Sequence, residues 1–292
     1  MKQIHVEAST FCNARCPLCP RSLYGYKVDG VHKELHLDPK VFEKVLEDYP
    51  EREYVYFNGN LGDPMMHPSI LELVKLNKCE SMITTNGSIG LQSTWIELAE
   101  HKVEVVFSID GLEDTNHLYR QDVEWNKIMD RAKWFIGAGG NAVWKFIVFR
   151  HNMHQVNEAK QLSETLGFKE FRQINHGRNY GPALDREGNI THWILPHNEK
   201  REPTPYDVKQ GIKRYKIDHR NFISEDRVYD IKCNHEIYNE VYIDARGRVS
   251  PCCFQAVDLP KVPFVNLESF PSLKETWATK KCNPVCAMNC GN

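Results

Sequence analysis

The sequence predicts an α/β fold with a parallel β-sheet, and two observations lead to this prediction. From residue 1 to about residue 175, short apolar runs alternate with amphipathic segments, which is typical of repeated βα units. Three of the expected strands run into polar turns that contain glycine, at 58–64, 84–87 and 108–111. In parallel βα folds the active site lies at the carboxyl ends of the strands. We therefore expect these turns to meet on one face.

Six strands are expected in this part of the chain, each rich in β-branched or aromatic residues: 3–8, 54–58, 81–85, 104–109, 143–149 and 170–174. Five helices are expected between them: 39–48, 69–76, 93–101, 125–138 and 155–166. Asp38 is placed to cap the first helix, because Pro39 follows it at the first helical position. Gly167 is expected to end the last one.

Two further parts follow the βα units. Residues 176 to about 232 are polar, contain several Gly and Pro and lack clear periodicity, so we expect a connecting segment with little regular structure. Beyond Cys233, a hairpin is predicted with strands at 240–244 and 248–250, followed by a helix near 272–279. The predicted domains are residues 1–205, whose βα part ends near 175, and a small C-terminal domain of residues 206–292.

Charge and hydropathy exclude several classes of protein. The formal net charge of the 292 residues is −2, so no general basic field is available for nucleic acid or an anionic membrane. The sequence shows no apolar run of membrane-spanning length and no signal peptide at its start. We therefore expect a cytoplasmic protein.

Ten cysteines are unlikely to form a disulfide framework in a reducing compartment, which favours a metal-binding or catalytic use. Cys12, Cys16 and Cys19 form a C-x3-C-x2-C motif directly after the first predicted strand. A [4Fe–4S] cluster normally takes four cysteine ligands, so three cysteines would leave one iron open to a reactive ligand. A zinc site is the alternative, with His5, His32 or His36 as a fourth ligand.

These residues resemble the radical SAM superfamily, whose signature is the same C-x3-C-x2-C motif. Leu18 stands where that family often has an aromatic residue. Segments 61–64, 85–87, 108–111 and 146–152 resemble the strand-end motifs of the family and occur in the same order. The resemblance covers residues 1 to about 175 and implies a partial (β/α)6 TIM barrel.

The resemblance also implies which residues bind S-adenosylmethionine. Gly62 and Asp63 lie in the turn that binds the methionine amino group, with Asp63 in place of the usual Glu. Ser108 matches a serine that reaches the ribose or the carboxylate, and Arg150 lies where a basic residue meets that carboxylate. The complete set of expected cofactor-binding residues is Leu18, Gly62, Asp63, Asn86, Ser108, Asp110 and Arg150. No residue is singled out as a general base.

The C-terminal part resembles the SPASM and twitch auxiliary modules. Cys233, Gly247 and Cys252 have the spacing that opens such a module. Too few cysteines follow for two clusters, so the resemblance implies one auxiliary [4Fe–4S] cluster on Cys233, Cys252, Cys286 and Cys290, with Cys282 as an alternative ligand. A zinc knuckle is the other interpretation of these cysteines.

The implied function is that of an enzyme that cleaves S-adenosylmethionine reductively to a 5′-deoxyadenosyl radical. The radical abstracts a hydrogen atom from the substrate, and the auxiliary cluster accepts an electron, so that the substrate is oxidised. Two [4Fe–4S] clusters and a one-electron donor such as flavodoxin or ferredoxin are expected, with a small molecule or a peptide as substrate. No nucleic acid or membrane partner is expected.

Two other functions remain open from the sequence. One is modification of a peptide or protein side chain, as in RiPP-type maturases. The other is a non-catalytic zinc or iron–sulfur binding protein.

Overall fold

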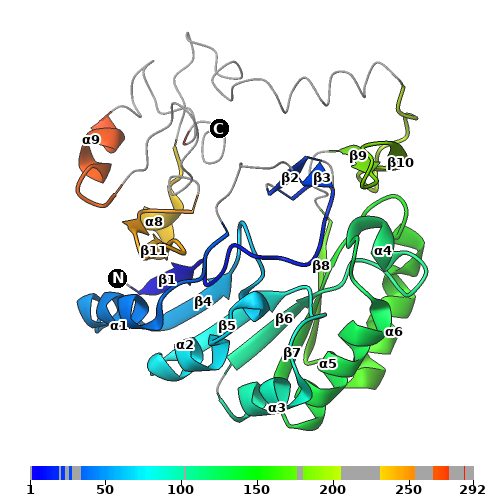
Figure 1. Ribbon diagram of the computed structural model, residues 1–292. Helices are drawn as coiled ribbons and strands as arrows, with labels where there is room; N and C mark the ends of the chain where they lie inside the picture. The colour runs from blue at the N-terminus through cyan, green and yellow to red at the C-terminus, as the bar shows by residue number, and fades with distance from the viewer. Residues whose placement is uncertain are drawn as a thin grey trace.

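The computed structural model describes residues 2–19, 21–23, 26–27, 34–101, 103–175, 180–204, 231–253, 266–275 and 286. Its centre is an eight-stranded sheet with the strand order β12-β11-β1-β4-β5-β6-β7-β8 (Figure 1). Every neighbouring pair from β11 to β8 is parallel, and only β12 is antiparallel to its neighbour. Two small hairpins, β2–β3 and β9–β10, lie outside this sheet.

The six predicted strands and five predicted helices are all confirmed, with small shifts at their ends. The strands are β1 (Gln3–Val6), β4 (Tyr54–Asn58), β5 (Glu80–Thr85), β6 (Val103–Ser108), β7 (Asn141–Ile147) and β8 (Glu170–Ile174). The helices are α1 (Pro39–Asp48), α2 (Ile70–Leu76), α3 (Gln92–Glu100), α5 (Trp125–Gly137) and α6 (Val156–Leu166). The Asp38 carboxylate accepts a hydrogen bond from Lys40 N at 2.8 Å, and Gly167 ends α6 at φ 90°. Both predicted helix-end signals therefore act as expected.

The shorter elements complete the structure. They are β2 (Ser22–Leu23), β3 (Tyr26–Lys27), η1 (Pro64–Met66), α4 (Asn116–Tyr119), η2 (Met153–Gln155), β9 (Gly181–Leu184), β10 (Ile190–Ile194), α8 (Asn234–Tyr238), β11 (Glu240–Ile243), β12 (Val249–Ser250) and α9 (Phe270–Glu275). The hairpin predicted after Cys233 is confirmed by β11 and β12. The last residues of the helix predicted at 272–279 lie outside the described residues.

One sequence prediction was wrong. The segment after residue 175 contains the antiparallel hairpin β9–β10, where little regular structure was expected. Its turn is closed by Asp185, whose carboxylate accepts hydrogen bonds from Glu187 N and Asn189 N, with Gly188 at φ 87°. Gly181 and Pro182 lie in β9 and Gly188 lies in the turn, positions where they are compatible with a hairpin.

The two faces of the main sheet differ in chemistry. One face packs on helices: Phe57 of β4 contacts Phe42 of α1, and Phe107 of β6 stacks on Trp95 of α3. The other face carries polar and aromatic residues, and His5 of β1 lies against the Tyr56 and Tyr242 rings. Residues along each strand thus point alternately to the apolar face under the helices and to the mixed interior face. This pattern is typical of a barrel whose helices form an outer ring.

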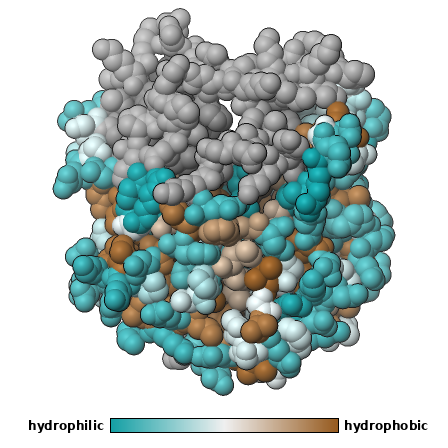
Figure 2. Space-filling view, viewed as in Figure 1, coloured by the Kyte–Doolittle hydropathy of each residue, from teal (hydrophilic) through white to brown (hydrophobic). Residues whose placement is uncertain are grey.

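Helices cover the outer face of the curved sheet, which is open within the described part of the chain because β8 and β12 are its edges (Figure 1). The arrangement matches the predicted partial barrel. On the surface turned to the viewer, hydrophilic and hydrophobic residues are interspersed over the helical side (Figure 2).

The chain brings its N- and C-terminal regions together in the sheet. β11 pairs with β1 in parallel, with His5 opposite Tyr242, and Glu7 N donates to Ile243 O at 2.9 Å. One hairpin of the predicted second domain is therefore continuous with the sheet of the first. The boundary near residue 205 stays a prediction.

Candidate functional site

The cysteine motif lies on a loop at the carboxyl end of β1, where the turn after β4 packs tightly against it. Asp63 N donates to Phe11 O at 2.7 Å. A Cβ atom built on Gly62 would lie 2.0 Å from Ser9 O, and one on Gly59 would lie 2.0 Å from Gly62 O. Only glycine fits such an approach of two backbones. The predicted meeting of the cysteine loop and the 61–64 turn is therefore present.

The three cysteines are largely enclosed. Cys16 is buried and Cys12 and Cys19 are partly buried. The loop is held by hydrogen bonds from Cys19 N and the Ser22 hydroxyl to Cys16 O, at 3.1 and 3.0 Å. Arg21 Nη1 donates to Cys12 O at 3.0 Å. These bonds fix the backbone of the motif from both sides.

Nitrogen donors lie next to two of the sulfurs. Ala14 N donates to Cys12 Sγ at 3.4 Å, and Asn86 Nδ2 lies 3.8 Å from the same sulfur. Arg120 Nη1 lies 3.7 Å from Cys16 Sγ. Burial, with smaller effects of Asp63 and Cys16, raises the pKa of Cys12 to about 12. A thiolate here consequently needs a bound cation or cationic cluster, because burial favours the thiol.

Asp63 organises the ends of two strands. Its carboxylate accepts hydrogen bonds from Met65 N at 3.0 Å, from Thr85 Oγ1 at 2.8 Å and from Asn86 N at 2.8 Å. Burial raises the pKa of Asp63, which these hydrogen bonds and the nearby Arg120 partly offset. The carboxylate therefore fixes the turn after β4 to the end of β5; its expected contact with methionine stays a prediction.

Asn86 links this corner to the cysteine loop. Its Nδ2 donates to Asn13 Oδ1 at 2.9 Å, and its Oδ1 accepts from Ser88 N at 2.9 Å and from the Ser88 hydroxyl at 2.6 Å. Asn13 Nδ2 in turn donates to Ser88 Oγ at 2.9 Å. Asn13 and Ser88 were not predicted from the sequence, although both lie close in the chain to predicted site residues.

The end of β6 carries Ser108 and Asp110. Ser108 is buried at the last position of the strand. Asp110 is completely buried; its Oδ2 accepts from Arg120 Nε at 2.7 Å and its Oδ1 from Ile147 N at 2.7 Å. Asn152 Nδ2 donates to Asp110 O at 2.8 Å. The structure thereby connects Asp110 to Cys16 through Arg120.

Arg120 was not predicted as a site residue. A buried carboxylate needs a cation, and Asp110 has Arg120 ten residues further along the chain, which is the signal that could have found it.

The remaining two predicted cofactor residues lie in different surroundings. Leu18 is partly buried and packs against the hydrophobic core beside Cys19. Arg150 forms an ion pair with Glu202 at 2.8 Å, with about a third of its side chain exposed. The Arg150 guanidinium is thus paired with an acidic side chain of this chain. Its expected role in binding the cofactor carboxylate stays a prediction.

Glu7 is another site residue that was not predicted from the sequence. Its carboxylate accepts from Asn60 N at 2.8 Å, Gly62 N at 3.1 Å and the Tyr242 hydroxyl at 2.8 Å. Burial raises the pKa of Glu7 to about 7, although these bonds oppose the shift. Glu7 joins the glycine turn beside the cysteine loop to the hairpin from the C-terminal region.

The predicted auxiliary ligands flank that same hairpin. Cys233 is buried at the N-cap of α8, the short helix that precedes β11, and Cys252 is partly buried just after β12. Cys286 is also buried. Cys282 and Cys290 lie outside the described residues, so their assignment stays a prediction.

The donor set of the cysteine loop fits an iron–sulfur cluster. Within the described ranges, no three His, Cys, Asp or Glu side chains are placed to hold a single metal ion. The loop supplies three enclosed thiols, Cys12, Cys16 and Cys19, and thiolate is the ligand type that holds iron–sulfur clusters.

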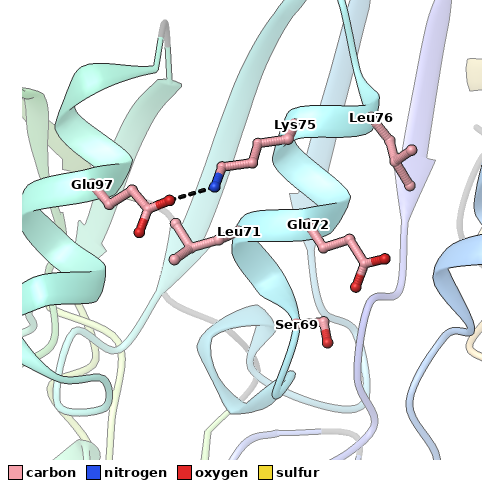
Figure 3. Close-up of a pocket in the computed structure, with 6 residues that line it drawn as sticks. All are labelled: Ser69, Leu71, Glu72, Lys75, Leu76 and Glu97. Carbon is pink, nitrogen blue, oxygen red and sulfur yellow. Dashed lines mark hydrogen bonds and ion pairs between the residues drawn. The ribbon is translucent and has the colours of Figure 1, made fainter.

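A surface pocket lies elsewhere, between α2 and α3 (Figure 3). It is lined by Ser69, Leu71, Glu72, Lys75, Leu76 and Glu97. Lys75 and Glu97 form an ion pair across it. The helices that carry the pocket lie on the outer face of the sheet, away from the strand ends that carry the cysteine loop (Figure 1). Also, no helix in the described ranges is long and apolar enough to cross a membrane.

Comparison with known sequences gives one relative of high similarity. No family model matches the chain. The tungsten-containing aldehyde ferredoxin oxidoreductase cofactor-modifying protein of Pyrococcus furiosus is 34% identical in an alignment 269 residues long, and the alignment covers 86% of this chain and 71% of that protein. This level of identity over most of both chains shows common family membership.

Solved structures share the fold. SuiB of Streptococcus suis, bound to S-adenosylmethionine, superposes with a TM-score of 0.58 at 16% identity, over 98% of this chain and 67% of that chain. The structure of anSMEcpe with bound AdoMet and a Cp18Cys peptide has a TM-score of 0.58 at 17% identity, over 96% and 82%. The shared fold agrees with the radical SAM resemblance of the cysteine motif, and the identity to the P. furiosus protein shows that this chain belongs to the family of that cofactor-modifying protein.

Proposed function

We propose that this protein uses a [4Fe–4S] cluster on Cys12, Cys16 and Cys19 to start a radical reaction with S-adenosylmethionine. The observation that supports this proposal best is the cysteine loop itself. It is packed against Gly62 with no room for a side chain, and its sulfurs face Asn86 and Arg120. When bound, the cluster supplies the electron that breaks the sulfur–carbon bond of S-adenosylmethionine, and the resulting 5′-deoxyadenosyl radical removes a hydrogen atom from the substrate.

The residues of this chain hold the cofactor and keep the site in shape. Gly62, Asn86 and Ser108 lie at or just beyond the carboxyl ends of the neighbouring strands β4, β5 and β6, so we assign them to the methionine and ribose ends of S-adenosylmethionine. Asp63 and Asp110 keep these strand ends in register through hydrogen bonds to backbone amides. Leu18 and Arg150 complete the proposed cofactor site.

We assign a second [4Fe–4S] cluster to the C-terminal region. Cys233 and Cys252 would provide two ligands from the two ends of the hairpin, joined by Cys286 and by Cys290 or Cys282. Four cysteine ligands would leave such a cluster without an open iron, so it would serve as an electron acceptor for the substrate radical. Residues 206–292 would then form an auxiliary domain, and a flavodoxin or ferredoxin would reduce the first cluster in the cytoplasm.

The substrate we favour is a small organic molecule related to a cofactor. The name of the P. furiosus relative, a cofactor-modifying protein, supports this class. A peptide is the second candidate, because SuiB and anSMEcpe were both solved with a peptide bound and share the fold.

Anaerobic reconstitution followed by iron and sulfide analysis tests the proposal. We expect about eight irons per chain, on four irons for each cluster, and release of 5′-deoxyadenosine from S-adenosylmethionine on reduction. Changing Cys12, Cys16 and Cys19 to Ala should remove about four irons and all cleavage. A protein that binds only zinc, and releases no 5′-deoxyadenosine, would disprove the enzymatic function.

The substrate classes are separated by a second measurement. Candidate cofactor precursors and peptides are added to the reduced enzyme, and the transfer of deuterium from labelled substrate into 5′-deoxyadenosine is followed by mass spectrometry. Transfer from a peptide, and from no small molecule, would replace the favoured substrate with the second candidate.

A further inference from the structure

Arg120 is a buried cation between an acidic residue and a cysteine sulfur. It follows α4, and its Nε donates to Asp110 Oδ2 at 2.7 Å while its Nη1 lies 3.7 Å from Cys16 Sγ. Only 15% of its side chain is exposed, and Asp110 is completely buried. The guanidinium is therefore largely shielded from water.

The orientation of Arg120 is fixed by its neighbours. Asp110 is itself held by Ile147 N at 2.7 Å and by Asn116 Oδ1, which accepts from Asp110 N at 2.9 Å. The guanidinium also lies over the Tyr119 ring, 5.3 Å from its centroid. With one end of the fork bound to Asp110, the other end is directed at Cys16 without further loss of side-chain freedom.

We propose that Arg120 raises the reduction potential of the cluster on Cys12, Cys16 and Cys19. This inference rests on the proposed function. The reduced cluster carries one more negative charge than the oxidised cluster, so a nearby guanidinium stabilises the reduced form more. Hydrogen bonds to the cysteine sulfurs, net charge and solvent exposure are known to set the potentials of such clusters, and burial strengthens the effect of a charge.

Asp110 sets the size of this effect. Its carboxylate balances most of the Arg120 charge while it holds the guanidinium in place. The potential of the cluster is then a compromise: Arg120 makes reduction by a one-electron donor easier, and Asp110 limits how far the potential rises. Changes at the two residues should therefore shift the potential in opposite directions.

A redox titration followed by electron paramagnetic resonance tests this. The first cluster is recognised because its signal changes when S-adenosylmethionine is added, and its midpoint is measured without S-adenosylmethionine. In Arg120→Gln, we expect the ratio of reduced to oxidised cluster at a fixed potential to fall about tenfold, which is a shift of about 59 mV for one electron. Arg120→Lys should give a smaller fall, and Asp110→Asn a rise.

The control is Arg186→Gln. Arg186 has 72% of its side chain exposed and pairs with Asp122 at 2.9 Å, so this variant removes the same charge from the surface. Its midpoint should equal that of the wild type. Iron content and circular dichroism are measured for every variant, to compare only folded, loaded proteins.

Each outcome decides the question. An unchanged midpoint in Arg120→Gln, with cluster content retained, overturns the inference while the proposed function stands. If Arg120→Gln assembles no cluster, the opposite shifts of Arg120→Lys and Asp110→Asn support it, and shifts of the same sign overturn it. A wild type without a signal sensitive to S-adenosylmethionine would overturn the proposed function as well.

Discussion

Replacing Gly62 by Ala should push the cysteine loop away from the turn after β4. The new Cβ would lie 2.0 Å from Ser9 O and 2.7 Å from Phe11 O. Real Cβ contacts almost never fall below 3.0 Å, so the turn and the loop must separate by about 1 Å. Both atoms belong to backbone, which cannot move aside as a side chain can.

The cost can be estimated from two effects. Overpacking at a close contact costs about 1–3 kcal/mol. The Asp63 N to Phe11 O bond of 2.7 Å lies across the same contact, and lengthening it costs about 1 kcal/mol more. We expect the variant to lose about 2–4 kcal/mol of unfolding free energy without cluster, and to bind less iron at Cys12, Cys16 and Cys19.

Chemical denaturation of the protein without cluster, and iron analysis after reconstitution, measure both effects. Gly137→Ala is the matched control, because Gly137 ends α5 and an added Cβ there meets no atom within 4 Å. It should be neutral or gain up to about 1 kcal/mol. A Gly62→Ala protein with wild-type stability and iron content would refute the close packing of turn and loop as a constraint on the site.

Three further predictions concern Glu7, Asp63 and Asp38. Burial raises the pKa of Glu7 from 4.5 to about 7, so the folded protein binds its proton more tightly than the unfolded chain does. The stability that this group contributes is therefore present below about pH 4.5 and is lost as the pH rises to about 7, by up to about 3 kcal/mol. In Glu7→Gln, the unfolding free energy should depend less on pH in denaturation curves measured from pH 5 to 8. An unchanged pH dependence would contradict the shift of the Glu7 pKa. Asp63→Ala leaves Thr85 and two backbone amides without their acceptor and should cost more than Asp63→Asn, by about 1–3 kcal/mol; equal stabilities would show that the carboxylate does not hold the turn. Asp38→Ala removes the cap of α1 and should cost about 1 kcal/mol of unfolding free energy without changing iron content, whereas a loss of iron would mean that α1 affects the site.

Local signals explain why much of the fold could be predicted. The cap at Asp38, the stop at Gly167 and the alternation of 54–58 each depend on neighbours in the chain. The hairpin β9–β10 was missed because its Pro and Gly residues have the same local signature in an irregular segment and in a tight turn. Only pairing across the hairpin, with Trp193 opposite Pro182, separates the two.

The site was predicted in part for a similar reason. Cys12, Gly62 and Asn86 follow strands, so a parallel sheet places them at one edge. The contacts of Arg120 with Cys16 and of Tyr242 with Glu7 could not be found in this way, because they span 104 and 235 residues. Nothing in the local sequence records a contact made at such a separation.

The sequence by itself determined the order of the βα units and the spacing of the three cysteines, because both depend on periodicity and on chain neighbours. The tertiary structure alone decided that β11 joins β1, that Gly62 touches the backbone of the cysteine loop, and that the Arg120 guanidinium lies between Asp110 and Cys16. The physical reason is that charge balance and steric fit in a buried site are settled between residues that only the folded chain brings together.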